Sequence, residues 1–331
     1  MLLEARSRVG GRLASLDTGE GGLDLGATWF WPNEPRIGAL VSELQLDTHA
    51  QYLAGDALVQ DASGVHRIRG NPIDVESRRV TLGLQAVADS LARELLPETI
   101  RYGSPVERIL RTGAGVAADT ATGRYEGQHL VIAIPPALAM SSIDFEPPLS
   151  EGTARLARAT PVWMGGMTKV VARYATPFWR EAGLAGACMS HAGPMREVHD
   201  MSGAHGSLAA LFGVAPPLAP GEPTVDREAI LDQLQALFGS KAPEPVTLTI
   251  HDWRAERFTS PPGVERLQAY ELFGDPLYAK PEMDGHVHWA STETAPAFPG
   301  HIEGALLAAA RAVEAIAHSG KDRSGASRNF I

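Results

Sequence analysis

The chain has 331 residues, of which 44% are hydrophobic and 21% are charged, and its formal net charge at pH 7 is -10. This length is sufficient for a large hydrophobic core and for two domains, and the acidic balance argues against nucleic acid or an anionic membrane surface as a partner. The single cysteine, Cys188, excludes an intramolecular disulfide and a cysteine-rich metal site. We therefore expect no bound metal and a small, buried side chain at Cys188.

The chain carries no recognisable targeting or membrane segment. Its first residues, Met-Leu-Leu-Glu-Ala-Arg, are charged too early for a secretory signal peptide. No run of about 18 apolar residues occurs, so no membrane-spanning helix is expected. These features predict a cytoplasmic protein.

The first hundred residues predict two helices with a β-hairpin between them. Residues 35–46 and 84–96 place apolar side chains at helical spacing. Residues 57–60 and 65–68 flank the sequence Asp-Ala-Ser-Gly, which is typical of a turn between two paired strands.

The rest of the chain alternates predicted strands and helices. The apolar run 130–134 ends at Pro135 and is typical of a strand buried on both faces of a parallel sheet. Further strands are predicted over residues 168–174, 208–213, 246–253 and 287–290, and further helices over residues 229–238 and 303–318. Gly320 lies where the last helix is expected to stop, and residues 321–331 are expected to be a disordered tail. This order favours an α/β nucleotide-binding domain with a second domain inserted into it.

A group of charged residues and glycines near the N-terminus is the first candidate for a binding site. Glu4 follows two leucines, and an acidic residue at the end of a strand in a dinucleotide-binding fold accepts hydrogen bonds from ribose hydroxyls. Arg8 and Arg12 bracket Gly10 and Gly11, where glycines let the backbone approach a ligand and arginines can pair with pyrophosphate oxygens. On spacing alone, an exposed basic turn is the more frequent explanation.

Residues 4–12, Glu-Ala-Arg-Ser-Arg-Val-Gly-Gly-Arg, resemble the second-strand signature of the flavin amine oxidases, the family that includes monoamine and polyamine oxidases. Other blocks similar to that family follow in its order and cover most of residues 2–318. They lie at residues 23–29, 106–109, 132–136, 168–170, 177–179, 253–258, 289–295 and 300–305.

The resemblance implies an α/β fold with an FAD/NAD(P)-binding Rossmann-like domain, incomplete at the N-terminus, and an inserted α+β substrate domain. We expect the FAD-binding domain over residues 1–55, 78–145 and 250–320, and the substrate domain over residues 56–77 and 146–249.

The resemblance also assigns the cofactor contacts. Glu4 is expected to bind the adenosine ribose of FAD, with Arg6 and Arg12 along the pyrophosphate. The other expected FAD contacts are Gly26, Ala27, Thr28, Trp29, Val106, Trp253, Ser291, Thr292, Gly300, His301 and Ile302. The expected substrate contacts are Trp29, Phe258, Gly263 and His301. Pro262 stands where some relatives carry a flavin-linking cysteine, so the FAD is expected to be non-covalent.

Lys169 is the expected catalytic residue. It lies inside the predicted strand 168–174, where a lysine is most often an exposed and solvated charge. In the family, the matching lysine holds a water against flavin N5, and burial would lower its pKa and suit it to proton handling.

The implied reaction is hydride removal from the carbon bearing the amine to flavin N5, hydrolysis of the imine, and reoxidation by O2 with release of H2O2. The expected partners are a small amine and O2, without nucleic acid or membrane. A homodimer is left open.

Three departures from the family pattern qualify this reading. No Gly-x-Gly-x-x-Gly unit precedes Leu2, so we expect either a true start upstream of Met1 or a chain that binds FAD poorly. The connection between Ile68 and Val80 is short, which predicts a substrate site that is more open or closed by another subunit. Gly263 and His301 occupy the positions of the two aromatic rings that enclose the amine in monoamine oxidases, so simple monoamine specificity is not implied.

Two alternatives stay open. A flavin dehydrogenase or desaturase acting on a non-amine substrate shares the same nucleotide motifs. The chain is alternatively an inactive fragment that no longer binds FAD.

Overall fold

The computed structural model describes residues 1–218, 225–240 and 242–326, with the backbone alone for residues 320–326. The chain forms two compact units, each made of segments that are distant in the sequence. Unit 1 comprises Met1–Arg8, Leu95–Gly165 and Arg257–Ile331, and unit 2 comprises Val9–Glu94 and Gly166–Glu256. The expected FAD-binding and substrate domains are defined by the molecule that each is expected to bind, whereas the two units are defined by contacts within the chain. The expected domain division therefore stays a prediction.

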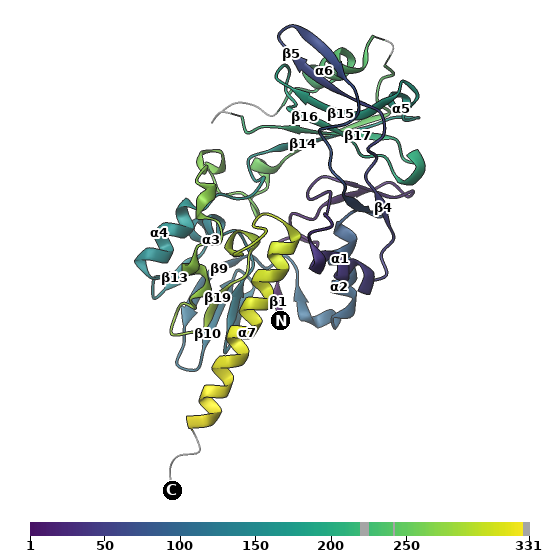
Figure 1. Ribbon diagram of the computed structural model, residues 1–331. Coiled ribbons are helices and arrows are strands. Elements are labelled where there is room, and N and C mark those ends of the chain that lie inside the picture. Colours follow the sequence, from purple (N-terminus) through teal and green to yellow (C-terminus); the bar gives the residue numbers. More distant parts are fainter. Residues whose placement is uncertain (219–224, 241, 327–331) are drawn as a thin grey trace. The chain divides into compact units, whose positions relative to one another are not determined.

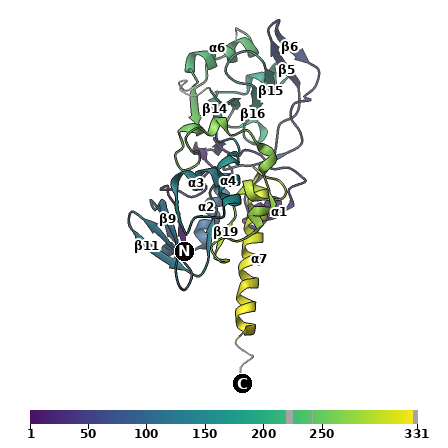
Figure 2. The same ribbon diagram turned by 90° about the vertical axis from the view of Figure 1, so that its left-hand side faces the viewer.

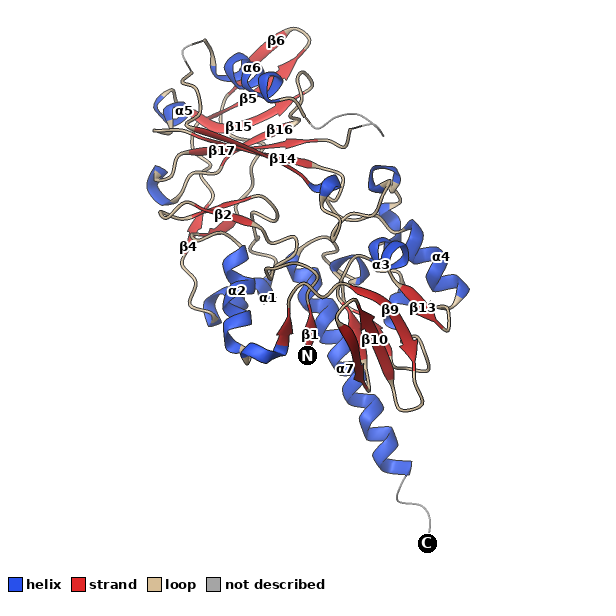
Figure 3. Cartoon of the chain, turned by 180° about the vertical axis from the view of Figure 1, so that it is seen from behind, coloured by secondary structure: helices blue, strands red, loops and turns tan. Residues whose placement is uncertain are grey.

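Unit 1 contains three small sheets among its described residues (Figure 3). Four strands in the order β11-β10-β9-β13 form the largest: β9 (Val106–Arg111), β10 (Val116–Thr120), β11 (Gly123–Gly127) and β13 (Asp144–Glu146). Two parallel pairs complete the set: β1 (Leu2–Leu3) with β8 (Ile100–Arg101), and β12 (Leu130–Ile132) with β19 (Val287–Trp289).

The helices of unit 1 pack around these sheets, and α3 and α4 lie side by side (Figure 2). Their bounds are α3 (Pro136–Ser142), α4 (Glu151–Ala159) and α7 (Ile302–Ala326), with short 3-10 helices at Pro97–Thr99, Val264–Arg266, Tyr270–Leu272, Pro276–Ala279 and Thr292–Thr294. The Ser150 hydroxyl starts α4 by accepting the backbone N–H of Thr153. The core of the unit joins Leu156 of this helix to Tyr278 and Trp289.

Two expectations for unit 1 are wrong in detail. Val131, at the centre of β12, is 44% exposed rather than buried, because side chains alternate across a strand and the face of β12 that carries Val131 is open, although the partner strand β19 is buried at every residue. The last helix continues past Gly320 to Ala326, since one glycine costs a helix only about 1 kcal/mol relative to alanine. Residues 327–331 of the expected tail lie outside the described residues.

Unit 2 is built on a seven-stranded sheet in the order β18-β14-β17-β16-β15-β5-β6 (Figure 1). Its strands are β5 (Asp56–Asp61), β6 (Gly64–Ile68), β14 (Thr168–Arg173), β15 (Leu184–Ser190), β16 (Glu197–Asp200), β17 (Ala210–Ala215) and β18 (Thr247–Asp252). Two antiparallel pairs accompany it: β2 (Ser15–Asp17) with β3 (Gly22–Asp24), and β4 (Thr48–Ala50) with β7 (Arg78–Val80). The helices are α1 (Pro35–Glu43), α2 (Gln85–Glu94), α5 (Phe178–Glu181) and α6 (Arg227–Phe238), with 3-10 turns at Ala204–Gly206 and Trp253–Ala255.

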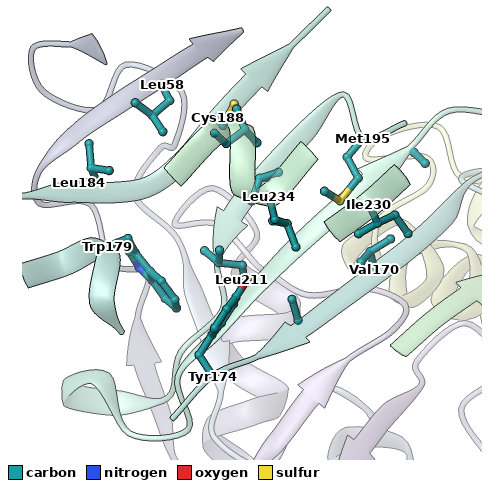
Figure 4. Packing of buried hydrophobic residues seen from close by; sticks show 14 of the residues in the cluster. Leu58, Val170, Tyr174, Trp179, Leu184, Cys188, Met195, Leu211, Ile230 and Leu234 are labelled. Carbon is teal, nitrogen blue, oxygen red and sulfur yellow. The ribbon is translucent and has the colours of Figure 1, made fainter. Parts of the chain in front are cut away.

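One face of the large sheet packs against α6, which lies over it in two views (Figures 1 and 2). The Asp226 carboxylate starts this helix by accepting the backbone N–H of Ala229. Apolar side chains of the helix, including Ile230 and Leu234, then meet sheet residues such as Val170 and Leu211 (Figure 4). Because side chains alternate along a strand, the neighbours of these residues point to the opposite face, which α6 does not cover.

Cys188 belongs to the α6-side core and is buried, as expected. Burial raises the pKa of its thiol to about 12, so the thiolate is disfavoured at neutral pH. This is the small buried side chain that the sequence predicts.

The predicted helices and the hairpin of unit 2 are confirmed, as are its strands over residues 168–174, 208–213 and 246–253, with ends that shift by a few residues. The strands β2, β3, β4, β7, β15 and β16 of unit 2 are absent from the prediction. Of these, β15 and β16 are buried along nearly their whole length, so neither shows the alternation of apolar and polar residues that marks a half-exposed strand. Among the described residues, no helix combines the length and apolar character needed to cross a membrane.

Truncation of Ile230 should destabilise unit 2, because this side chain is fully buried between α6 and the sheet. We expect Ile230→Ala to lower the free energy of unfolding by about 2–5 kcal/mol and Ile230→Val by about 1 kcal/mol. Urea unfolding followed by circular dichroism measures both. Gln235→Ala, at an exposed position of the same helix, is the control and should change the value by less than about 0.5 kcal/mol. Equal effects at positions 230 and 235 would contradict this packing.

Candidate functional site

The N-terminal signature is anchored by β1 in unit 1. Glu4 follows β1, where its N–H donates to the carbonyl of Arg101 (2.9 Å) and its own carbonyl accepts the N–H of Ser104 (2.9 Å). Its Oε1 accepts the backbone N–H of Arg6 at 2.7 Å. The carboxylate is therefore held in one orientation at the end of a strand, as a ribose ligand requires.

Arg6 is engaged with a distant segment of unit 1. Its guanidinium donates to the Thr259 hydroxyl (2.8 Å) and to the carbonyl oxygen of Phe258 (3.3 Å). The guanidinium carbons of Arg6 and Arg257 also lie 5.8 Å and 4.4 Å from the centre of the Phe258 ring. Phe258, the expected substrate contact, thus has a ring flanked by two cations.

The C-terminal block of unit 1 precedes the long helix α7. Thr292 Oγ1 donates to the carbonyl oxygen of His301 (2.7 Å), which fixes the turn from which the helix begins at Ile302. Ser291 is 2% exposed, and its hydroxyl has no hydrogen-bond partner among the described residues. The indole N–H of Trp289 is likewise buried without a described partner. Two buried polar atoms close together in the sequence thus lack a hydrogen-bond partner among the described residues, which is uncommon in a folded protein.

Trp163 packs against this block, although it lies far from it in the sequence and was not among the expected site residues. A Cβ at Gly300 would lie 2.5 Å from the Trp163 ring, so only glycine allows the indole to pack there. The backbone N–H of Trp163 donates to the Glu293 carboxylate (3.2 Å), and the ring lies 6.4 Å from that of His301. No motif in the sequence announces this contact.

Two further expected contacts of unit 1 lie apart from these interactions. Val106 is the first residue of β9 and is half-buried. Gly263 has a left-handed backbone (φ of 79°) and open space around the position of a Cβ. Their expected roles, like those of the other site residues, stay predictions.

In unit 2 the structure brings the Arg12 segment against the Gly26 turn. The N–H of Ala27 donates to the Arg12 carbonyl (3.2 Å), and those of Leu25 and Gly26 donate to the carbonyl of Ala14. A Cβ at Gly26 would overlap the Arg12 carbonyl oxygen. The glycine is therefore required by the protein's own backbone, besides any approach to a cofactor.

Lys169 lies on the face of the large sheet that α6 does not cover. It is 5% exposed, and its Nζ forms no hydrogen bond or ion pair with the described residues. The ammonium instead lies 4.5 Å from the centre of the Phe212 ring. Burial lowers the pKa of Lys169 to about 8, although the charges of Glu197 and Asp24 act in the opposite direction. A lysine with this pKa can exchange a proton near neutral pH.

Asp24 is a second buried ionisable group that the sequence did not single out. Its Oδ1 accepts the Ser15 hydroxyl (2.6 Å) and the backbone N–H of Leu84 (2.8 Å), while Oδ2 has no hydrogen-bond partner among the described residues. Burial raises the pKa of this carboxyl to about 6, against the hydrogen bond from Ser15 and the charges of Arg79 and Lys169.

Trp29 packs against Phe212, the aromatic residue whose ring also contacts the Lys169 ammonium. Its indole N–H donates to Gln51 Oε1 (2.9 Å), and its ring meets those of Phe212 and His199 edge-on, at 5.5 Å and 5.2 Å between centres. Thr28 donates its hydroxyl to the carbonyl of Gly26 (3.3 Å). The strand prediction over residues 208–213 contained the signal for Phe212, but His199 lies in the unpredicted β16.

Trp253 has a structural bond that the sequence did not reveal. Its indole N–H donates to the Leu25 carbonyl (2.8 Å), and its backbone N–H donates to the Met167 carbonyl (3.1 Å). It thereby ties the Gly26 turn to the edge of the large sheet. Among the described residues, no group of three or more histidine, cysteine, aspartate or glutamate side chains is arranged to hold a metal ion.

The sequence matches the model of a family described as flavin containing amine oxidoreductase, over residues 1–82 and 74–317. An L-amino acid dehydrogenase of Synechocystis is 32% identical over 247 residues, which cover 71% of this chain and 50% of that protein. The flavin-containing amine oxidase B of Sus scrofa is 28% identical over 277 residues, which cover 79% of this chain and 51% of that protein. The chain thus spans about half the length of these curated relatives.

Solved structures share the fold. A putrescine oxidase bound to putrescine has a TM-score of 0.79 and 21% identity, covering 95% of this chain and 93% of that chain. The cyclohexylamine oxidase from Brevibacterium oxydans has a TM-score of 0.80 and 21% identity, covering 96% of this chain and 93% of that chain. The expected α/β fold class with a Rossmann-like domain is confirmed.

Addition of one methyl group at Gly26 should disrupt unit 2, because that methyl would overlap the Arg12 carbonyl. We expect Gly26→Ala to lower the free energy of unfolding by about 1–3 kcal/mol or more, as overpacking does. Gly38→Ala is the matched control, since Gly38 lies within α1 with open space around its Cβ position. It should be neutral or stabilising by about 0.5–1 kcal/mol. Chemical denaturation of both variants tests the contrast, which a loss at position 38 equal to that at position 26 would refute.

Burial of Lys169 should make stability depend on pH in a defined direction. Its folded-state pKa of about 8 lies below the usual 10.5, so the folded protein releases this proton first and gains stability as the pH rises between the two values. Relative to Lys169→Met, the wild-type protein should gain on the order of 3 kcal/mol across this window. Urea unfolding of both proteins at several pH values from 7 to about 10.5 measures the difference, and a constant difference would exclude a depressed pKa.

Proposed function

Because the chain belongs to the family of flavin-containing amine oxidoreductases, whose members use FAD, we propose that it is an FAD-dependent oxidoreductase that oxidises an amine. The observation that carries the proposal is Lys169: a buried ammonium without a described polar partner, beside the ring of Phe212, which in turn packs against the ring of Trp29. A charge buried in this way costs free energy, and such groups concentrate at functional sites.

Buried atoms of unit 1 fit a polar cofactor. The Ser291 hydroxyl and the Trp289 indole N–H lack described partners, and both lie next to the turn that leads into α7. The start of this 25-residue helix carries partial positive charge and would stabilise an anionic group near Ile302. The proposed FAD contacts in unit 1 are Glu4, Arg6, Val106, Ser291, Thr292, Gly300, His301 and Ile302.

The proposed FAD contacts that lie in unit 2 are Arg12, Gly26, Ala27, Thr28, Trp29 and Trp253. Non-covalent binding is proposed, since Pro262 cannot form the thioether that a cysteine provides. When bound, FAD would supply the redox chemistry: it would accept a hydride from the carbon bearing the amine and pass the two electrons to O2 as H2O2, and the imine would hydrolyse.

The chain's own groups would position the substrate and move protons. The partly exposed ring of Trp29, which packs edge-on against the fully buried ring of Phe212, would offer an apolar surface to the carbon skeleton of an amine. Lys169 would hold a water through its Nζ and transfer a proton during reoxidation, because its pKa of about 8 lies close to neutral pH. Phe258, Gly263 and His301 are proposed as the further substrate contacts. A cytoplasmic location and a homodimer stay predictions.

A flavin dehydrogenase is the second candidate function. It is favoured by the relative from Synechocystis, whose name is L-amino acid dehydrogenase. The two candidates differ in the electron acceptor, which is O2 for an oxidase and another compound for a dehydrogenase. An inactive fragment without FAD is the outcome that would exclude both.

The deciding experiment loads the purified protein with FAD and supplies a panel of monoamines, diamines and L-amino acids. An oxidase releases H2O2, whereas a dehydrogenase reduces an artificial electron acceptor without peroxide. In stopped-flow measurements, Lys169→Met should slow flavin reoxidation by roughly 100-fold, within the range of general acid–base catalysis, and leave FAD affinity nearly unchanged. Lys280→Met, at an exposed position, is the control. A protein that is colourless after incubation with FAD and removal of the unbound FAD would refute the proposal.

Removal of the Glu4 carboxylate should weaken FAD binding, because the group is already oriented by the N–H of Arg6. We expect Glu4→Ala to raise the FAD dissociation constant roughly 10- to 100-fold, as the loss of a charged hydrogen bond costs ~1.5–3 kcal/mol. Titration of FAD followed by the quenching of its fluorescence measures the constant. Glu107→Ala, an exposed acid in β9 of the same unit, should leave it unchanged. The same constant for Glu4→Ala and wild type would remove Glu4 from the site.

A further inference from the structure

The strands β14, β17 and β16 place a row of functional side chains on one face of the large sheet. In the observed register, Lys169 pairs with Val214 and Val214 with Glu197, while Val171 pairs with Phe212 and Phe212 with His199. Residues in register and two apart along a strand share a face. Lys169, Phe212, Glu197 and His199 therefore all lie on the face that α6 does not cover.

His199 is held between two carboxylates on this face. Its Nδ1 lies 2.6 Å from Asp74 Oδ1, and its Nε2 lies 3.4 Å from Glu197 Oε2. The His199 and Asp74 side chains are 9% and 6% exposed, whereas Glu197 is 46% exposed. Burial alone would lower the pKa of His199, but the hydrogen bonds with Asp74 and Glu197 outweigh it, and the pKa lies above its ordinary value of 6.5. The two carboxylates thus stabilise the imidazolium form of His199.

Asp74 is itself prepared for this contact. Asn71 donates its side-chain amide to Asp74 Oδ2 (2.9 Å), and Asn71 Oδ1 accepts the backbone N–H groups of Ile73 (3.2 Å) and Asp74 (3.1 Å). One oxygen of the Asp74 carboxylate is thereby fixed, and the other is presented to His199. The ion pair ties the short connection between β6 and β7 to the sheet.

The ring of Trp29 rests on this arrangement from two sides. Its ring meets His199 edge-on at 5.2 Å, and its indole N–H is bound by Gln51. Gln51 in turn donates to the carbonyl oxygen of Asp200, the residue after His199 (2.7 Å). Both supports of the indole therefore come from the end of β16.

We propose that His199 is a positioning residue: its ion pair with Asp74 fixes the ring of Trp29 against Phe212, whose ring also contacts the Lys169 ammonium, and thereby sets the affinity for the substrate. The substrate part of this inference rests on the proposed amine oxidation. The orientation of Trp29 does not, since it is a property of the folded chain.

The pH dependence of the His199–Asp74 ion pair follows from the charged groups around His199. Asp74 contributes from the connection between β6 and β7, Glu197 from β16, and Lys169 from β14 on the far side of Phe212. A histidine whose folded-state pKa is raised contributes its full stabilisation below pH 6.5, its value without partners, and loses it as the pH rises through the folded-state pKa. Trp29 should accordingly be held at acidic to neutral pH and released above the pKa of His199.

The first measurement follows the indole Nε1–H resonance of Trp29 by NMR from pH 5.5 to about 9, a window that brackets an ordinary and a raised histidine pKa. Trp29→Phe assigns the signal. In the wild-type protein the resonance should titrate with a midpoint above 6.5. The titration should vanish in His199→Gln and move to lower pH in Asp74→Asn. Because the wild-type titration needs no variant, a Trp29 signal that does not respond to pH would overturn the proposal even if a variant fails to fold.

The second measurement separates KM from kcat for the amine that the panel identifies. His199→Gln and Asp74→Asn should each raise KM roughly tenfold, which corresponds to ~1.4 kcal/mol of binding, with kcat little changed. Glu197→Gln is the matched control, since it removes the weaker and more exposed partner and should shift KM less. An unchanged KM in His199→Gln would refute the substrate role. A wild-type protein without turnover would refute the proposed function instead, while the NMR titration would still decide the position of Trp29.

Discussion

The burial of the Lys169 ammonium is the constraint that shapes the face of the large sheet that α6 does not cover. A cation removed from water loses solvation that only charges, dipoles or aromatic faces can replace. Here the replacement is partial: the Phe212 ring lies beneath the ammonium, and the charges of Asp24 and Glu197 act without a direct ion pair among the described residues. The position is unfavourable for stability, and for the same reason its amine can gain and lose a proton near neutral pH.

The sheet makes that burial possible by keeping its two faces distinct. One face is closed by α6 through Val170, Leu211 and the apolar side of the helix. The other face receives Phe212 and His199, which are in register, and Lys169, which lies two residues from the position paired with Phe212. A slip of one residue in any of these strands would exchange the two sets, so the hydrophobic contact with α6 also fixes the polar face.

Unit 1 combines a carboxylate oriented by its own backbone with buried polar groups that have no described partner. Glu4 is oriented by its own chain, and Gly300 is kept free of a side chain so that Trp163 can pack against it. The Ser291 hydroxyl and the Trp289 indole N–H are buried without described partners, which is costly in a folded protein unless another molecule satisfies them. These features agree with membership of a family whose members carry FAD, while the chain spans about half the length of its curated relatives.

The sequence by itself determined the family and the fold class, because residues 4–12 and the later blocks are short motifs. Such motifs can be recognised from the order of residues alone, without the folded structure. It also located three helices of unit 2 (α1, α2 and α6) and five of its eleven described strands, since hydrophobic periodicity follows directly from helix and strand geometry. It placed Lys169 in a strand, but it could not tell a buried face from an exposed one.

Tertiary structure alone decided which residues surround these positions. Strand β16 is buried along nearly its whole length and shows no alternation, so His199 and Glu197 carried no signal in the sequence. Asp74 meets His199 across 125 residues, and the glycine at position 26 is explained by a carbonyl 14 residues earlier. Such contacts depend on strand register and on the course of loops, which non-local packing fixes and local sequence does not encode. The family can therefore be identified from the sequence alone, whereas the residues that surround Lys169 are brought together only when the sheet folds.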